Sequence, residues 1–176
     1  AFITHDIDNL RSGWKAPAKA ALKQGNLLRF GQQLWQHLTR PDAWDNLETI
    51  AATVAEYGAR STFFILPEHQ LGADGTPNAD YPITPALQQR LLQLQQQGCE
   101  IGLHGSIGTA IDAQHLGREL MILPPCLGLR FHYLRWDPRR TPALLEAFVE
   151  TELRFDSSLG FAEHFGFRHS YCRPFY

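Results

Sequence analysis

Segments with strand character alternate with helical patterns along this 176-residue chain, and this alternation constrains the fold more than any other feature. The segment 61–66, STFFIL, is rich in aromatic and branched residues and predicts a buried strand. The segment 84–98 begins with a Thr-Pro pair, carries leucines at helical spacing and ends in glycine, which predicts a capped helix. Further strands are expected at 1–4, AFIT, and at 99–103, and the segments 126–136 and 153–161 are each expected to be a strand followed by a loop. Strands that alternate with helices predict βαβ units and a parallel sheet, an α/β fold.

Two more helices are expected in the first third of the chain. Apolar residues at steps of three and four from Asp42 onward predict an amphipathic helix that ends at Gly58. The other helix covers about Pro17 to Leu38, and its candidate buried positions are Leu27, Leu28, Leu34, Trp35 and Leu38.

Composition limits the classes of function. Hydrophobic residues make up 44% and charged residues 19%, which suits one globular domain with a substantial core. The net charge is −2 and there is no basic run, so no nucleic-acid partner is expected. No apolar segment approaches the length of a membrane span. The three cysteines, an odd number without a C-x-x-C pair, predict buried thiols rather than a disulfide framework. We expect a single catalytic domain over 1–176 that is truncated at its C-terminal end.

Ionisable residues stand at the C-terminal ends of four expected strands. They are Asp6 and Asp8, His104, Arg130 and His132, and Asp156. Side chains two residues apart on a strand point the same way, so both aspartates of THDID share a face. In barrels built from parallel strands, chemistry sits at the C-terminal strand ends, so these groups are expected to meet. Carboxylate and imidazole suit zinc, and a second, non-ligating aspartate could accept a proton from metal-bound water.

Each of these groups also has a purely structural interpretation. The aspartates could form a solvated turn, His104 could be an ordinary loop residue, and Asp156 could cap a turn. The residues 130–136 could form a cation–π and packing cluster. The remaining histidines are interpreted as surface or core residues; they are His37, His69, His115, His164 and His169.

The ordered motifs resemble those of the polysaccharide deacetylases of carbohydrate esterase family 4, the nodulation-type deacetylase domain. Residues 4–8, THDID, are similar to a D-x-D variant of its first motif, and residues 91–106 to the helix and strand that carry its second. Residues 130–133, RFHY, are similar to the third motif, Arg-x-Pro-Tyr, and residues 155–158 to the fourth. The resemblance implies an irregular, incomplete (β/α) barrel with parallel strands.

The resemblance also implies roles for single residues. Asp6 would be the catalytic base, oriented by Arg130, while Asp8 and His104 would bind a divalent metal ion, with Zn²⁺ the expected one. Backbone N–H groups near Tyr133 would stabilise an oxyanion.

This chain departs from the family at the third metal ligand. The second histidine of the His-Ser/Thr-x-x-His motif would fall at position 108, which is Gly108. His132 stands where the third motif usually has proline, and we predict it as the replacement ligand, with Thr109 as a weaker candidate. The alternatives are that His132 only forms a hydrogen bond in the groove, or that the metal ion is lost altogether. The histidine of the fifth motif, a general acid, has no match before Tyr176.

The resulting hypothesis is a metal-dependent hydrolase that removes an acyl group, with acetyl expected, from an amino sugar or glycan. Phe131, Trp136 and Asp156 are its predicted substrate-binding residues, although Phe131, Tyr133 and Trp136 could equally pack in the core. Two alternatives stay open. One is a glycan-binding relative without turnover, and the other is a metal hydrolase acting on a different non-peptide C–N bond, such as a cyclic amide or formamide.

Overall fold

A computed structural model describes residues 3–148 and 153–161, and within them five parallel strands form one sheet. The strands are β1 (Ile3–Ile7), β2 (Ser61–Ile65), β3 (Glu100–Gly105), β4 (Gly128–Phe131) and β5 (Phe155–Asp156). They stand side by side in chain order, and each neighbouring pair is parallel. The prediction of an α/β fold with a parallel sheet is therefore confirmed.

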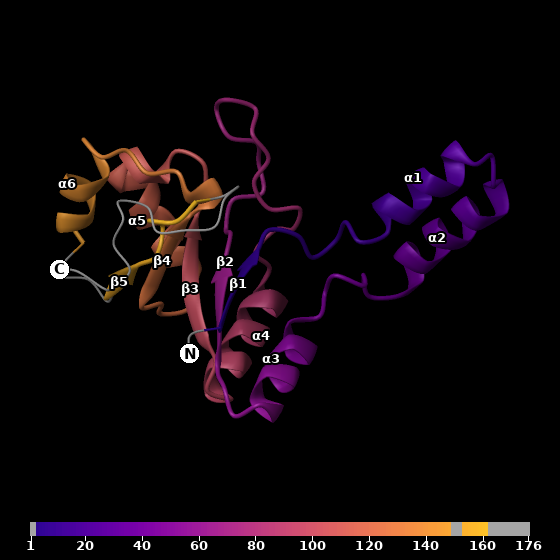
Figure 1. Cartoon of the computed structure of the whole chain (residues 1–176), viewed down its shortest axis with the longest axis horizontal. Helices are drawn as coiled ribbons and strands as arrows, with labels where there is room; N and C mark the ends of the chain where they lie inside the picture. The colour runs from indigo at the N-terminus through magenta and orange to yellow at the C-terminus, as the bar shows by residue number, and fades with distance from the viewer. Residues whose placement is uncertain (1–2, 149–152, 162–176) are drawn as a thin grey trace.

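Helices connect these strands. They are α1 (Lys15–Lys23), α2 (Leu27–Thr39), α3 (Leu47–Glu56), α4 (Pro85–Gln96), α5 (Ala113–Ile122) and α6 (Thr141–Glu146), with short 3₁₀ turns η1 (Thr109–Ile111) and η2 (His132–Leu134). Figure 1 shows α3 and α4 side by side along β1 and β2, and α5 and α6 near β4 and β5. No helix among the described residues is long and apolar enough to cross a bilayer.

The core lies between the sheet and the helices that flank it. Every residue of β2 is buried, as the composition of STFFIL predicts. Leu91 and Leu94 of α4 and Leu116 of α5 join the same apolar cluster. Thr84 caps α4 through its side chain, which accepts a hydrogen bond from the Leu87 backbone N–H at 3.2 Å. The helical periodicity thus identified the covered face of α4, where Leu87, Leu91 and Leu94 are buried. In the 42–58 pattern it holds for Leu47, whereas Tyr57 at the end of α3 is exposed.

The sheet is strongly curved. Arg130 of β4 contacts Asp6 of β1 at 2.7 Å, although β2 and β3 lie between these strands. In a flat sheet the first and fourth strands would lie about 14 Å apart, with side chains perpendicular to the line that joins them. Such a contact requires the two strand ends to turn toward each other. Closure of a barrel is not shown by the described residues, and the incomplete barrel remains a prediction.

The prediction for the first helical region is wrong. The segment forms two helices rather than one, separated at Gly25, whose φ of +68° suits glycine at a helix end. None of the residues of α2 is buried, including all five candidate core positions. Figure 1 shows the reason: α1 and α2 form a hairpin that projects away from the sheet, so α2 has no core to face.

The expectation for the cysteines holds in part. Cys126 is buried and Cys99 is half-buried. Cys172 lies outside the described residues.

Candidate metal centre

Asp8 follows directly after β1. Residues of the loop after β2 form hydrogen bonds with the backbone at this strand end. The Tyr81 hydroxyl donates to the Ile7 carbonyl at 2.5 Å and accepts from the Leu66 N–H at 3.3 Å. The Asp80 N–H donates to the Asp8 carbonyl at 3.1 Å. These bonds fix the strand end from which the Asp8 side chain projects.

Backbone carbonyls set the tautomers of two buried histidines. The Nδ1 of His104 lies 2.7 Å from the Arg130 carbonyl oxygen, so this nitrogen carries the proton and donates it. The Nε2 of His132 lies 3.2 Å from the Pro77 carbonyl oxygen and donates in the same way. A neutral imidazole has one donor and one acceptor nitrogen. The lone pairs therefore reside on Nε2 of His104 and Nδ1 of His132.

These two lone pairs converge on one carboxylate oxygen. Oδ1 of Asp8 lies 3.4 Å from His104 Nε2 and 3.6 Å from His132 Nδ1, and the two nitrogens are 3.1 Å apart. Ligands placed tetrahedrally at zinc-ligand bond lengths would lie about 3.3 Å from one another. Asp8, His104 and His132 therefore form a cluster that could hold a metal ion.

The balance of hydrogen-bond donors and acceptors in the cluster also fits a bound cation. Oδ1 of Asp8 is buried and has no hydrogen-bond donor. Because both histidine protons are used on carbonyls, three acceptor atoms face one another. Buried acceptors without a partner are costly, and a bound cation removes that cost.

The pKa shifts of Asp8 and His132 favour the forms of these two groups that can bind a metal ion. Burial opposes ionisation of Asp8, but the close contact with His104 and the electrostatic interaction with both histidines outweigh it, so the pKa of Asp8 lies below its usual value. Burial lowers the pKa of His132 and favours its neutral form, against the opposing effect of Asp8. Carboxylate and neutral imidazole are the forms that bind metals.

Asp6 lies on the same face of the chain as Asp8 and is bound by arginine. The Arg130 Nη1 donates to Asp6 Oδ1 at 2.7 Å and to the Thr4 hydroxyl at 3.2 Å, while its Nε donates to the Ser157 hydroxyl at 3.1 Å. The guanidinium carbon lies 4.4 Å above the ring centre of Phe64. The Asp6 carboxylate is thus fixed in direction and remains partly open to solvent.

Position 108 contributes no ligand. Gly108 has a φ of +100°, in the left-handed region, and caps the turn η1. The structure instead brings His132 to the cluster, as the sequence predicted for the replacement ligand.

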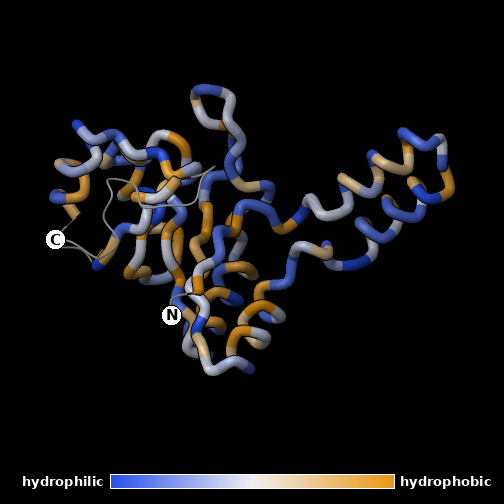
Figure 2. Tube along the Cα trace, in the orientation of Figure 1, coloured by the Kyte–Doolittle hydropathy of each residue, from blue (hydrophilic) through white to orange (hydrophobic). Residues whose placement is uncertain are grey.

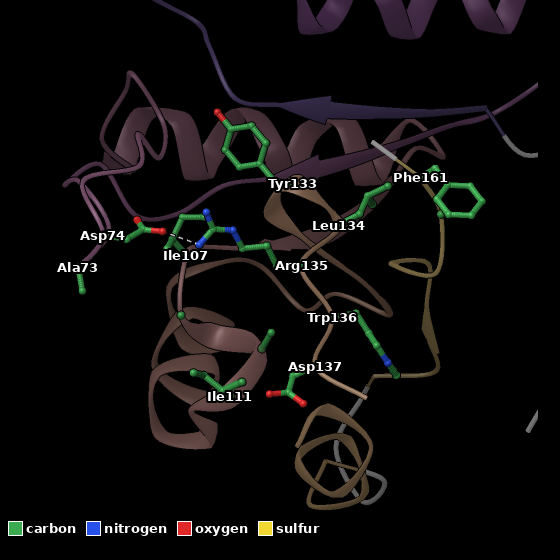
Figure 3. A pocket seen from close by; sticks show the side chains of 13 residues that line it. Ala73, Asp74, Ile107, Ile111, Tyr133, Leu134, Arg135, Trp136, Asp137 and Phe161 are labelled. Atoms are coloured by element: carbon green, nitrogen blue, oxygen red, sulfur yellow. Dashed lines mark hydrogen bonds and ion pairs between the residues drawn. The ribbon is translucent and has the colours of Figure 1, made fainter. Parts of the chain in front are cut away.

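A hollow of about 650 Å³ lies at the exit of β4; its lining includes Tyr133, the residue after His132, but no residue of the cluster itself. Tyr133 lines it with a side chain that is 53% exposed, and its ring packs against the His132 ring with centroids 4.3 Å apart. Trp136 also lines it while packing against the core. Figure 3 shows Arg135 pointing toward Asp74, another lining residue, to which its Nη1 donates a hydrogen bond at 2.6 Å.

The two other predicted substrate-binding residues do not reach this hollow. Phe131 is 1% exposed and belongs to the apolar core, so the core-packing interpretation holds for it. Asp156 accepts hydrogen bonds from the backbone and hydroxyl of Ser158 at 3.0 and 2.6 Å. The Ser158 hydroxyl accepts in turn from the Phe131 N–H at 2.8 Å. Burial raises the pKa of Asp156 to about 6. The residue supports the end of β4 through Ser158.

No family model, curated protein or solved structure matches this chain. What the site can do therefore follows from its own geometry.

Sequence reasoning missed the loop between β2 and α4 as part of the site. Its glycine, proline and asparagine residues indicated only an irregular segment. The loop supplies the Pro77 carbonyl that orients His132, and Asp80 and Tyr81, which hold the end of β1. A backbone carbonyl has no signature in the sequence, so only the fold could identify this contribution.

Proposed function

We propose that this chain is a metal-dependent hydrolase of the polysaccharide deacetylase type, which removes an acetyl group from an amino sugar or glycan. One observation carries the proposal. Three lone-pair atoms converge within 3.6 Å of one another, next to a second carboxylate that an arginine holds in place.

Asp8, His104 and His132 would hold the metal ion. Their mixture of one carboxylate oxygen and two imidazole nitrogens matches the donor sets of catalytic zinc, which use three protein ligands and leave one position open. When bound, zinc polarises a carbonyl and lowers the pKa of a coordinated water.

Asp6 would act as the proton acceptor. Its Oδ1 is occupied by Arg130, so Oδ2 is the oxygen that can take a proton. Arg130 is itself held by Thr4 and Ser157, which limits rotation of the pair. A base that is fixed in direction loses little entropy when the reaction begins.

The hollow at the β4 exit would receive the sugar. Tyr133 and Trp136 offer the aromatic faces against which sugar rings commonly pack, and the Arg135–Asp74 pair bounds one side. Tyr133 and Leu134 both have positive φ values, 55° and 51°, in the left-handed region that non-glycine residues seldom adopt. Such backbone strain often accompanies functional sites, and it supports the assignment of an oxyanion donor among the N–H groups near Tyr133.

The proposal is tested by metal analysis and acetate release on the same protein. Purified chain loaded with zinc should bind one ion per molecule and release acetate from N-acetylglucosamine oligomers. Asp8→Ala should lose both properties. His37→Ala, which removes a histidine in α2, is the matched control and should keep both.

The outcomes separate the alternatives. A zinc-loaded protein that binds the oligomers without releasing acetate would indicate the glycan-binding relative. Hydrolysis of formamides or cyclic amides in place of acetylated sugars would assign the site to another C–N bond.

A further inference from the structure

The hairpin of α1 and α2 presents an apolar face to solvent. At about 100° per residue, five apolar side chains of α2 fall within an arc of about 120°. This apolar arc consists of Leu27, Leu28, Leu34, Trp35 and Leu38. Leu28 is 90% exposed and Trp35 is 68% exposed. Figure 2 shows hydrophobic residues along the hairpin, well away from those of the sheet.

The packed side of α2 is less apolar than its exposed side. Four residues of α2 are partly covered, namely Phe30, Gln33, Gln36 and His37. On α1 the buried residues are Ala18 and Ala21. An amphipathic helix normally turns its apolar stripe inward. The reversed arrangement in α2 indicates that the apolar arc is covered by something outside the described residues.

The positive charge of the hairpin indicates which kind of partner surface would match it. All lysines of the chain lie in α1, as Lys15, Lys19 and Lys23, and all are exposed. Between residues 9 and 41 there are six lysines and arginines and no aspartate or glutamate, which gives this segment a charge of +6. Because the whole chain has a net charge of −2, the remaining residues together carry −8. Because the lysines are four residues apart, they do not form a basic run in the sequence. On a helix the same spacing places them along one side.

The hairpin is a defined structure with a fixed attachment. The Asp42 carboxylate accepts hydrogen bonds from the backbone N–H groups of Gly13 and Trp44 at 2.9 and 3.0 Å. The bond to Gly13 joins the segment that enters the hairpin to the segment that leaves it. The Trp14 and His37 rings stack with centroids 4.5 Å apart. The apolar arc therefore belongs to a folded element that the domain holds outward.

We propose that this hairpin docks the protein on an anionic lipid bilayer, with the apolar arc inserted among the acyl chains and the lysines of α1 near the headgroups. Amphipathic helices that lie in a membrane interface combine an apolar face containing tryptophan and leucine with lysine and arginine on the polar side. Negative lipids attract such cations within about a Debye length.

Charge also argues against a second copy of this chain as the occupant. Pairing the apolar arcs of two molecules would bring two segments with six positive charges each together, without a carboxylate between residues 9 and 41 to compensate. Such like-charge contact is unfavourable. An anionic bilayer satisfies the apolar arc and the cations at the same time.

The test is sedimentation of the 1–176 chain with lipid vesicles. The protein should sediment with vesicles of phosphatidylcholine mixed with phosphatidylglycerol, and much less with phosphatidylcholine alone. Each lysine near an anionic surface strengthens binding about fivefold, so joint replacement of Lys15, Lys19 and Lys23 by glutamine should weaken binding by about a hundredfold. High salt should weaken binding of the unaltered chain.

A second variant separates insertion from charge attraction. Joint Leu28→Gln, Trp35→Gln and Leu38→Gln keeps every charge and should abolish sedimentation, whereas Leu28→Gln with Leu38→Gln keeps Trp35 and should abolish the blue shift of its emission on lipid addition. Tyr57→Gln with Met121→Gln is the matched control, because these residues are 83% and 87% exposed but lie outside the hairpin. The control should bind vesicles like the unaltered chain. Circular dichroism reports whether each variant is folded.

Three results would overturn the proposal. They are failure to sediment with anionic vesicles, equal binding to neutral and anionic vesicles, and a lipid-free dimer that the Leu28, Trp35 and Leu38 substitutions dissociate. The last result would assign the apolar arc to a second copy. None of these measurements uses the hydrolytic activity, so the outcome is independent of the proposed function.

Discussion

Arg130 in β4 binds Asp6 in β1 across two intervening strands, with 2.7 Å between Nη1 and Oδ1. The residues between them make the contact feasible. The ring centre of Phe64 in β2 lies 4.4 Å from the guanidinium carbon. Gly102 of β3 has no side chain, and a Cβ at this position would come to 2.7 Å from the Phe64 ring. The curvature of the sheet and the direction of the Asp6 carboxylate thus depend on the same set of residues.

Arg130→Lys should lower kcat/KM by about 10–100-fold while the metal content stays unchanged, a range typical of residues that orient a functional group. Lysine keeps the charge but cannot bind Asp6, Thr4 and Ser157 in one plane. Steady-state kinetics and metal analysis of the same preparation check this. Unchanged kinetics would show that charge alone suffices.

Asp6→Asn should leave zinc bound and reduce kcat by about 10²–10⁴, the usual loss on removing a general base. Asparagine occupies the same volume and can still accept a hydrogen bond from Arg130, so the fold should persist. Acetate release and zinc stoichiometry are the measurements. If zinc is lost together with activity, Asp6 is a ligand and the roles of the two aspartates need to be exchanged.

Much of the sheet and of the cluster could be predicted because the relevant signals are local. STFFIL has the composition of a buried strand, and the D-x-D spacing places two carboxylates on one face wherever a strand forms. His104 and Arg130 pair in register across β3 and β4, so their meeting follows from parallel strands alone. His132 could be placed with them because it follows the same strand.

Other features depend on long-range packing and could not be predicted. The periodicity of α2 is that of a core helix, and nothing within the segment records that it leaves the domain. The phenyl ring of Phe131 is buried although the segment that begins two residues later, at Tyr133, lines the hollow, because β4 ends at Phe131 and the chain turns through positive φ at Tyr133. Pattern alone does not give the direction of a side chain at such a turn.

His132→Ala should weaken zinc binding by at least about a hundredfold, because the site falls from three protein ligands to two. Alanine also removes the contact with the Pro77 carbonyl, so the loop after β2 should exchange amide hydrogens faster. Competition titration with a zinc chelator checks the affinity, with His37→Ala as the control. Equal affinity in His132→Ala and the unaltered chain would exclude His132 as a ligand.

Glu119 in α5 is a buried acid outside the metal cluster. Its Oε2 accepts a hydrogen bond from the Ser106 N–H at 3.1 Å, while its Oε1 is buried without a hydrogen-bond partner and lies 3.6 Å from His115 Nε2. Burial raises the pKa of Glu119 to about 7, and the nearby charge of Glu68 adds to the shift, while the Ser106 hydrogen bond and His104 oppose it.

The raised pKa of Glu119 predicts a stability that falls as pH rises. Between the ordinary glutamate pKa near 4.5 and the folded value of about 7, the folded chain keeps a proton that the unfolded chain has released. The free energy of unfolding therefore declines through this window and levels off above it, by roughly 3 kcal/mol at most. Glu119→Gln removes this ionisation, and its amide can still accept from the Ser106 N–H while its NH₂ faces His115. Urea unfolding of metal-free protein should therefore show a variant that gains stability over the unaltered chain between pH 5 and pH 8. The prediction is wrong if the difference in free energy of unfolding between variant and unaltered chain stays constant across that range, or if the variant becomes relatively less stable as pH rises. Either result would show that Glu119 is ionised in the folded chain and that His115 compensates its charge.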